Sequence, residues 1–118
     1  MSEGQAHLTV STKDEVTIVE FSDRKILEEL SIRTIEEQLF DLVGAQTGIK
    51  LLLNFHNVEH LSSAALGMLI NLDKQVARQS GQLMLSDINP QIFEVFKITQ
   101  LHRMFKIHDT AATAMKHF

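Results

Sequence analysis

The sequence predicts one α/β domain, with a mixed, mainly parallel sheet of four to five strands packed with about four α-helices. The chain has 118 residues, which is enough for a single hydrophobic core, so we treat residues 1–118 as one domain. Hydrophobic residues make up 44% of the chain and charged residues 22%, as in an ordinary globular protein. Short apolar runs alternate with segments of helical periodicity, which is the order expected of an α/β sheet.

The first two strands form a predicted hairpin. Residues 7–11 and 16–21 alternate between apolar and polar side chains, and polar residues 13–15 separate the two runs. We therefore expect these strands to pair in the antiparallel direction.

A helix is predicted over residues 30–43. Its apolar residues recur at helical spacing, at Ile32, Ile35, Leu39 and Leu42. Ser31 is the expected N-cap, because its hydroxyl can accept a hydrogen bond from a free backbone N–H. Gly44 or Gly48 is expected to end the helix.

A buried strand, a second helix and a further strand follow. Residues 49–55 form a nearly continuous apolar run, which is typical of a strand covered on both faces. Ser62 and Ser63 precede a helix over residues 64–79. The predicted apolar stripe of this helix comprises Leu66, Leu69, Ile70, Val76 and Ala77. Residues 82–86 form the next predicted strand.

The C-terminal part contains two more predicted helices around a short edge strand at residues 104–107. Asn89 and Pro90 open the first of these helices, because proline suits the first helical position. The predicted buried face of that helix comprises Ile92, Phe93 and Phe96. Asp109 is the expected cap of the last helix. The helical crossovers should make the strands they join parallel and the connections right-handed.

Composition and charge argue against several classes of function. The formal net charge is −4, and the longest basic run is the pair Arg24-Lys25, so we expect no nucleic acid partner and no binding to an anionic membrane. The absence of cysteine excludes disulfides, thiolate nucleophiles and sulfur-ligated metals. The N-terminal residues show no signal peptide, and the longest apolar stretch, residues 64–70, is too short to cross a bilayer. We therefore expect a cytoplasmic protein.

No motif indicates catalysis or cofactor binding. The sequence has neither a nucleophile elbow nor a glycine-rich phosphate-binding motif. His56 and His60 are four residues apart, but they flank a predicted turn instead of sharing a helix, which argues against metal ligation. We expect no catalytic residue, no cofactor and no metal. A serine hydrolase that uses Ser63 with one of the six histidines is the weaker alternative.

Two serines lie where the buried strand gives way to the second helix. A helix N-terminus has unpaired N–H groups and the positive end of the helix dipole, so a phosphate on a serine there would find hydrogen-bond donors. The alternative is a serine that serves only as an N-cap. The small residues Ala64, Ala65 and Gly67 either leave a flat surface for another protein or let the helix pack closely on its own sheet.

The same stretch resembles a known family. Residues 51–55 followed by residues 58–70 are similar to the STAS domain, the fold of bacterial anti-sigma factor antagonists. In that family an apolar strand leads into a helix through a turn that reads approximately Asp-Ser-Ser/Ala/Thr-Gly-Leu-Gly. The corresponding turn here reads Ser62-Ser63-Ala64-Ala65-Leu66-Gly67. The resemblance continues through residues 81–85 and 90–105, so it covers nearly the whole chain.

The resemblance implies an anti-sigma factor antagonist that regulates transcription by partner switching. In such proteins the serine that matches Ser63 is phosphorylated by an anti-sigma factor that is itself a serine kinase. The unphosphorylated form binds the anti-sigma factor and thereby frees the sigma factor. The phosphorylated form releases the anti-sigma factor until a serine phosphatase removes the phosphate. The expected partner-binding residues are Ser62, Ser63, Ala64, Ala65, Leu66, Gly67 and Met68, with Asp23 and Arg24 from the loop at residues 22–25.

Two departures from the family pattern keep a second hypothesis open. Ser62 stands where the family has Asp, and Ala65 stands where it has Gly. The first departure removes a carboxylate beside the acceptor hydroxyl, although Ser62 keeps an oxygen that can cap the helix. The second hypothesis is therefore a STAS scaffold subunit of a larger signalling or transport complex, without phosphorylation.

Overall fold

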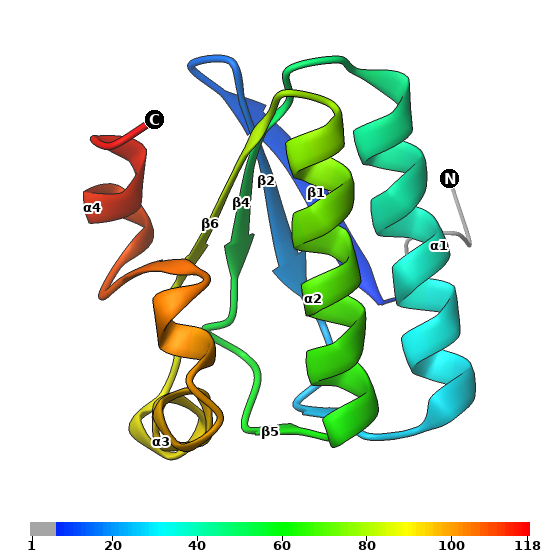
Figure 1. Ribbon diagram of the computed structural model, residues 1–118, viewed down its shortest axis with the longest axis vertical. Helices are drawn as coiled ribbons and strands as arrows, with labels where there is room; N and C mark the ends of the chain where they lie inside the picture. Colours follow the sequence, from blue (N-terminus) through cyan, green and yellow to red (C-terminus); the bar gives the residue numbers. More distant parts are fainter. Residues whose placement is uncertain (1–6) are drawn as a thin grey trace.

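A five-stranded sheet crosses the centre of the molecule, with helices on both sides of it (Figure 1). The computed structural model describes residues 7–118. The strand order of the sheet is β1-β2-β4-β6-β7. These strands are β1 (Leu8–Lys13), β2 (Val16–Phe21), β4 (Lys50–Asn54), β6 (Gln82–Ser86) and β7 (Lys106–His108).

The strand pairing confirms the predicted mixed, mainly parallel sheet. β1 and β2 form the antiparallel hairpin, with Leu8 opposite Phe21. β2, β4, β6 and β7 run parallel to one another. The three crossovers between them pass through α1 (Glu29–Ala45), α2 (Ser63–Arg78) and α3 (Pro90–Ile98).

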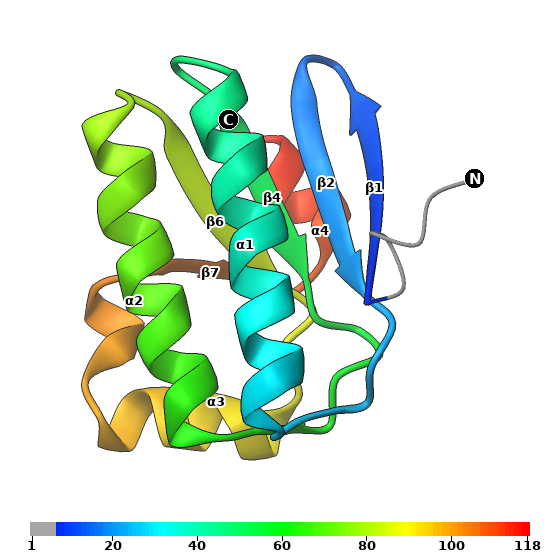
Figure 2. The same cartoon turned by 90° about the vertical axis from the view of Figure 1, so that its right-hand side faces the viewer.

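The helices form unequal layers on the two faces of the sheet. α1 and α2 lie side by side on one face, and α4 (Ala111–Met115) lies on the other (Figure 2). α3 lies across the end where the parallel strands finish, and a 3₁₀-helix (Leu101–Arg103) follows it. The main core, between the sheet and the two long helices, includes Phe21, Ile35, Leu39, Leu51, Leu53, Phe55, Leu69 and Leu72. A second, smaller core beneath α4 comprises Val16, Leu52, Met84 and Ala114.

Two helices begin at residues other than the predicted caps. The N-cap of α1 is Glu28, which has an extended backbone and makes no side-chain cap hydrogen bond, so Ser31 already lies within the helix. α4 is capped by Thr110 and not by Asp109, because the Thr110 hydroxyl accepts a hydrogen bond from the Thr113 N–H at 3.1 Å. Within residues 7–118, every helix is too short or too polar to reach across a lipid bilayer.

The predicted ends and faces of the two long helices also need correction. α1 includes Gly44, and the turn after it uses Gly48, whose φ of 74° favours glycine. Ala77, predicted on the apolar stripe of α2, is exposed. The buried residues of α2 are Ala65, Leu66, Met68, Leu69, Leu72 and Val76.

A second, two-stranded sheet was not predicted. It pairs β3 (Lys25–Ile26) with β5 (His60–Leu61) in the parallel direction, next to the start of α2. The Ser62 N–H extends this pairing by donating a hydrogen bond to the Ile26 carbonyl at 3.1 Å. Strands of two residues are too short to produce a sequence pattern. Their effect is to fix the segment before α1 beside the N-terminus of α2.

Candidate functional site

Ser62 is the N-cap of α2. Its backbone is extended, and its Oγ accepts a hydrogen bond from the Ala65 N–H at 3.1 Å. Its carbonyl accepts a helical hydrogen bond from the Leu66 N–H, also at 3.1 Å. The helix therefore already uses the Ser62 hydroxyl oxygen as a capping acceptor.

Ser63 is the first residue of α2, and its side chain is exposed. Within residues 7–118, no side-chain hydrogen bond involves its hydroxyl, and in particular no histidine is bonded to it, as a serine nucleophile would require. The first turn of α2 carries no acidic side chain, so the positive end of the helix dipole is not offset there. A phosphate on Ser63 would lie at this positive end.

Burial divides the predicted partner-binding residues of α2 into two groups. Ala65, Leu66 and Met68 are buried, so their side chains mainly hold the helix against the rest of the fold. Ala64 is exposed and Gly67 is half-buried. A Cβ atom added at Gly67 would meet nothing within 4 Å, so the packing of the fold does not require a glycine there.

A shallow groove runs between α1 and α2 beside these small residues. It is lined by Glu29, Ile32, Arg33, Glu36, Ala64, Gly67, Met68 and Asn71. The α1 side of the groove carries an exposed ion pair, with 3.8 Å between the Arg33 and Glu29 side chains. Its α2 side has two small residues, so the backbone of α2 is accessible there to another molecule.

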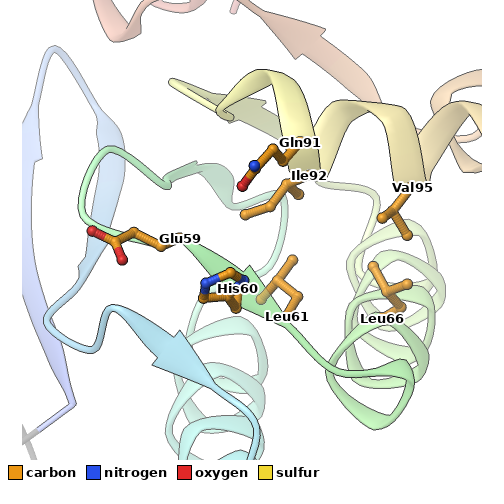
Figure 3. Close-up of a pocket in the computed structure, with 7 residues that line it drawn as sticks. All are labelled: Glu59, His60, Leu61, Leu66, Gln91, Ile92 and Val95. Atoms are coloured by element: carbon orange, nitrogen blue, oxygen red, sulfur yellow. The ribbon is translucent and has the colours of Figure 1, made fainter.

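A separate hollow lies between α3 and the segment that leads into α2 (Figure 3). It is lined by the apolar residues Leu61, Leu66, Ile92 and Val95 and by the polar residues Glu59, His60 and Gln91. Its volume is about 120 Å³, close to the size of one apolar side chain. Leu66 is three residues after Ser63, so the two positions neighbour each other on one side of α2. The hollow therefore lies on the Ser63 side of the helix.

Asn89 holds α3 in place beside this hollow. Its Oδ1 accepts a hydrogen bond from the Ile92 N–H at 2.8 Å, which caps α3 where the sequence predicted that the helix opens. Its Nδ2 donates to the Val58 carbonyl at 3.2 Å, which ties the helix to the segment before β5. The contribution of α3 was missed from the sequence, because the hollow joins residues about thirty positions apart that share no local pattern.

The loop at residues 22–25 lies beside the start of α2. Asp23 is held by His7, with 2.8 Å between the His7 Nδ1 and the Asp23 Oδ2. The Arg24 carbonyl accepts hydrogen bonds from the N–H groups of Glu59 and His60, at 2.6 and 3.1 Å. The structure thus brings together the two segments that were predicted to bind a partner.

His56 and His60, which the sequence did not favour as metal ligands, have different surroundings. The His56 ring Nδ1 lies 2.9 Å from the Asn54 Oδ1, and its Nε2 lies 3.9 Å from the Glu20 Oε1. His60 instead lines the hollow beside α3. Among the residues that the structure describes, no group of three or more His, Asp or Glu side chains is placed to hold a metal ion.

Comparison with known sequences gives one family. The family model described as the STAS domain matches residues 7–114. A Thermotoga neapolitana protein, provisionally named an anti-sigma factor antagonist, is 36% identical over 67 residues. Those residues are 57% of this chain and 59% of that relative, so the chain matches about three fifths of the relative's length.

Solved structures show the same fold. A crystal structure of a Thermotoga maritima protein, also provisionally named an anti-sigma factor antagonist, has a TM-score of 0.84 and 24% identity, and the match covers 98% of this chain and 97% of that one. The Bacillus cell fate determinant SpoIIAA, solved in its phosphorylated form, has a TM-score of 0.69 and 15% identity, with 93% of this chain and 97% of that one covered. At these identities the likeness establishes a shared fold.

Proposed function

Because the chain belongs to the STAS domain family, we propose that it is a cytoplasmic anti-sigma factor antagonist that acts by binding and not by catalysis. Its partner would be an anti-sigma factor that is also a serine kinase, with a serine phosphatase to reverse the modification. The proposal involves no nucleic acid and no membrane. The names of the relatives support the class of function.

The observation that carries the proposal is the difference between Ser62 and Ser63. The Ser62 oxygen caps α2, whereas the Ser63 side chain is exposed at the first position of the same helix. Ser63 is therefore the hydroxyl available to a kinase, as its match to the family motif implies. The proposed partner-binding surface consists of Ser62, Ser63, Ala64 and Gly67 with Asp23 and Arg24; we call it the docking surface.

Phosphorylation would change contacts at this surface without unfolding the helix. A phosphate adds about −1.5 to −2 charge at pH 7, and a helix N-terminus favours negative charge. In a protein interface, however, the same charge would lie against the small residues Ala64 and Gly67, where losing its water is unfavourable. Phosphorylation would thus stabilise the free protein and weaken the complex.

The test is phosphorylation by the anti-sigma factor kinase that binds this protein. Incubation with the kinase and ATP should add one phosphate by intact mass to the natural sequence and to Ser62→Ala, and none to Ser63→Ala. In calorimetry, Ser63→Ala should bind the kinase like the natural sequence, whereas Ser63→Asp should bind more weakly. Equal affinity for Ser63→Ala and Ser63→Asp would contradict the switch.

One observation favours a second candidate function. Ser62 replaces the family's Asp beside the acceptor hydroxyl, which is the change expected if no kinase acts on the site. The chain would then be a scaffold subunit of a larger signalling or transport complex. No gain in mass with the kinase, together with a stable large complex by light scattering, would support this function over the first.

A further inference from the structure

Among residues 7–118, α4 alone covers the second face of the sheet, opposite α1 and α2 (Figure 1). Ala114 of α4 is buried against Val16, Leu52 and Met84. Ala111, Met115 and Phe118 pack around this cluster. A helix of five residues is too short to be stable by itself, so contacts with the sheet must hold α4 in place.

Two histidine rings stack where α4 meets the edge of the sheet. The ring centroids of His108, in β7, and His117, just after α4, are 4.6 Å apart, and the ring planes differ by 23°. The His117 Nδ1 lies 3.0 Å from the Thr113 carbonyl, so this nitrogen is the donor and carries the proton of the neutral ring. The Nε2 is then the nitrogen of the neutral His117 ring that carries no proton.

The surroundings of His108 favour its neutral ring. Burial is the largest cause that lowers the pKa of His108, followed by the neighbouring His117. Asp109 acts in the opposite direction, and Lys106 lowers the pKa further. A lowered pKa means that the folded protein binds a proton less readily than the unfolded chain does. The contact is therefore intact above the pKa of a free histidine and weakens as the pH falls below it.

The neighbouring strand adds one more charged group. Ser86 of β6 is the register partner of His108, and Asp87 follows it in the chain. The Asp87 side chain accepts a hydrogen bond from the Ser86 hydroxyl at 2.7 Å. The Asp87 backbone N–H donates to the His108 carbonyl at 3.4 Å. These hydrogen bonds hold Asp87 on the strand. Two positively charged imidazolium rings at the distance of the stack would repel each other.

We propose that the His108–His117 stack is a pH-sensitive latch, which holds α4 on the sheet at neutral pH and releases it in mild acid. Release uncovers the apolar centres of β4 and β6, at Leu52 and Met84, which α4 otherwise covers. The latch lies on the face of the sheet opposite α1 and α2, so it works independently of the docking surface.

Hydrogen exchange of the full chain tests the latch. Exchange in residues 111–118 is measured at about pH 7.5 and about pH 5.5, which span the pKa of histidine, and is corrected for the intrinsic rate. We expect α4 to open severalfold more often at the lower pH, because the folded protein binds a proton at His108 less readily than the unfolded chain does. The amides of α1 serve as the internal reference and should not respond.

Two variants separate the latch from general acid sensitivity. His117→Phe keeps an aromatic ring in the stack but cannot be charged, so α4 should exchange equally at both pH values. His102→Gln removes a half-buried histidine outside the stack and should keep the response of the natural sequence. If His117→Phe leaves α4 open at both pH values, His108→Phe, which retains the bond of His117 to Thr113, makes the same comparison. The proposal would be overturned if α4 of the natural sequence exchanged equally at both pH values. It would also be overturned if a phenylalanine variant whose α4 stays docked still exchanged faster at the lower pH.

Discussion

Ser62 and Ser63 have different roles although they are adjacent and chemically identical. The Ser62 oxygen accepts the Ala65 N–H and so completes the first turn of α2. The Ser63 side chain faces solvent and contributes no hydrogen bond within the described residues. One hydroxyl therefore belongs to the fold, and the other is exposed at the surface.

This division predicts unequal effects on stability. Ser62→Ala should lower the free energy of unfolding by about 1 kcal/mol, because one N–H at the start of α2 loses its acceptor. Ser63→Ala should change it by less than about 0.5 kcal/mol, as expected for an exposed position. Urea denaturation of the two variants measures the difference. Similar losses in both variants would show that Ser62 is not the cap in solution.

At the scale of the element, α2 contains a glycine that its packing does not need. Gly67 lies in the interior of the helix, where glycine is less favourable than alanine by roughly 0.5–1 kcal/mol, yet an added Cβ would meet open space. Gly44 in α1 is also free of close neighbours, but it lies in the last turn of its helix and outside the docking surface. The two glycines therefore form a matched pair.

Replacing these glycines should separate stability from binding. Gly67→Ala should raise the free energy of unfolding by about 0.5–1 kcal/mol, and Gly44→Ala should raise it by a smaller amount because it is near a helix end. Only Gly67→Ala should weaken binding to the anti-sigma factor, since its methyl group would hold the partner away from the helix backbone. Calorimetric binding with both variants checks this. Equal affinities would remove Gly67 from the docking surface.

The elements that could be predicted from the sequence are those with long patterns. The apolar spacing of α1 and α2 and the continuous run of β4 led to the correct helices, strand and crossovers. The caps at Glu28 and Thr110 were missed, because the residue at which a helix begins depends on the tertiary contacts that position the chain before it. β3 and β5 were missed for a similar reason, since their pairing arises from the tertiary structure and not from their own composition.

At the scale of the whole molecule, the fold gathers distant segments at the end where the parallel strands finish. The loop at residues 22–25, the start of α2 and the hollow beside α3 all lie there. The sequence predicted that the first two of these segments bind a partner. The fold then explains why they lie close together. The hollow could not be predicted, because it joins residues about thirty positions apart that share no local sequence pattern.

This arrangement predicts that α3 contributes to partner binding on one side only. Val95 lines the hollow and is 41% exposed, whereas Ile98, which is 76% exposed, lies on the same helix outside it. Val95→Arg should weaken binding to the anti-sigma factor roughly tenfold, as expected for a blocked anchor pocket, and Ile98→Arg by less than about twofold. Surface plasmon resonance with both variants measures this. If the more exposed Ile98 has the larger effect, the hollow is not part of the interface.

The short β3–β5 pairing has a consequence for recognition. Two residues on each side join the loop at residues 22–25 to the chain that enters α2, so hydrogen bonds hold the two segments together. A partner therefore meets a surface that is already organised and loses little conformational entropy in ordering it. Association should then be limited by the orientation of the two proteins and not by a slow rearrangement of this one.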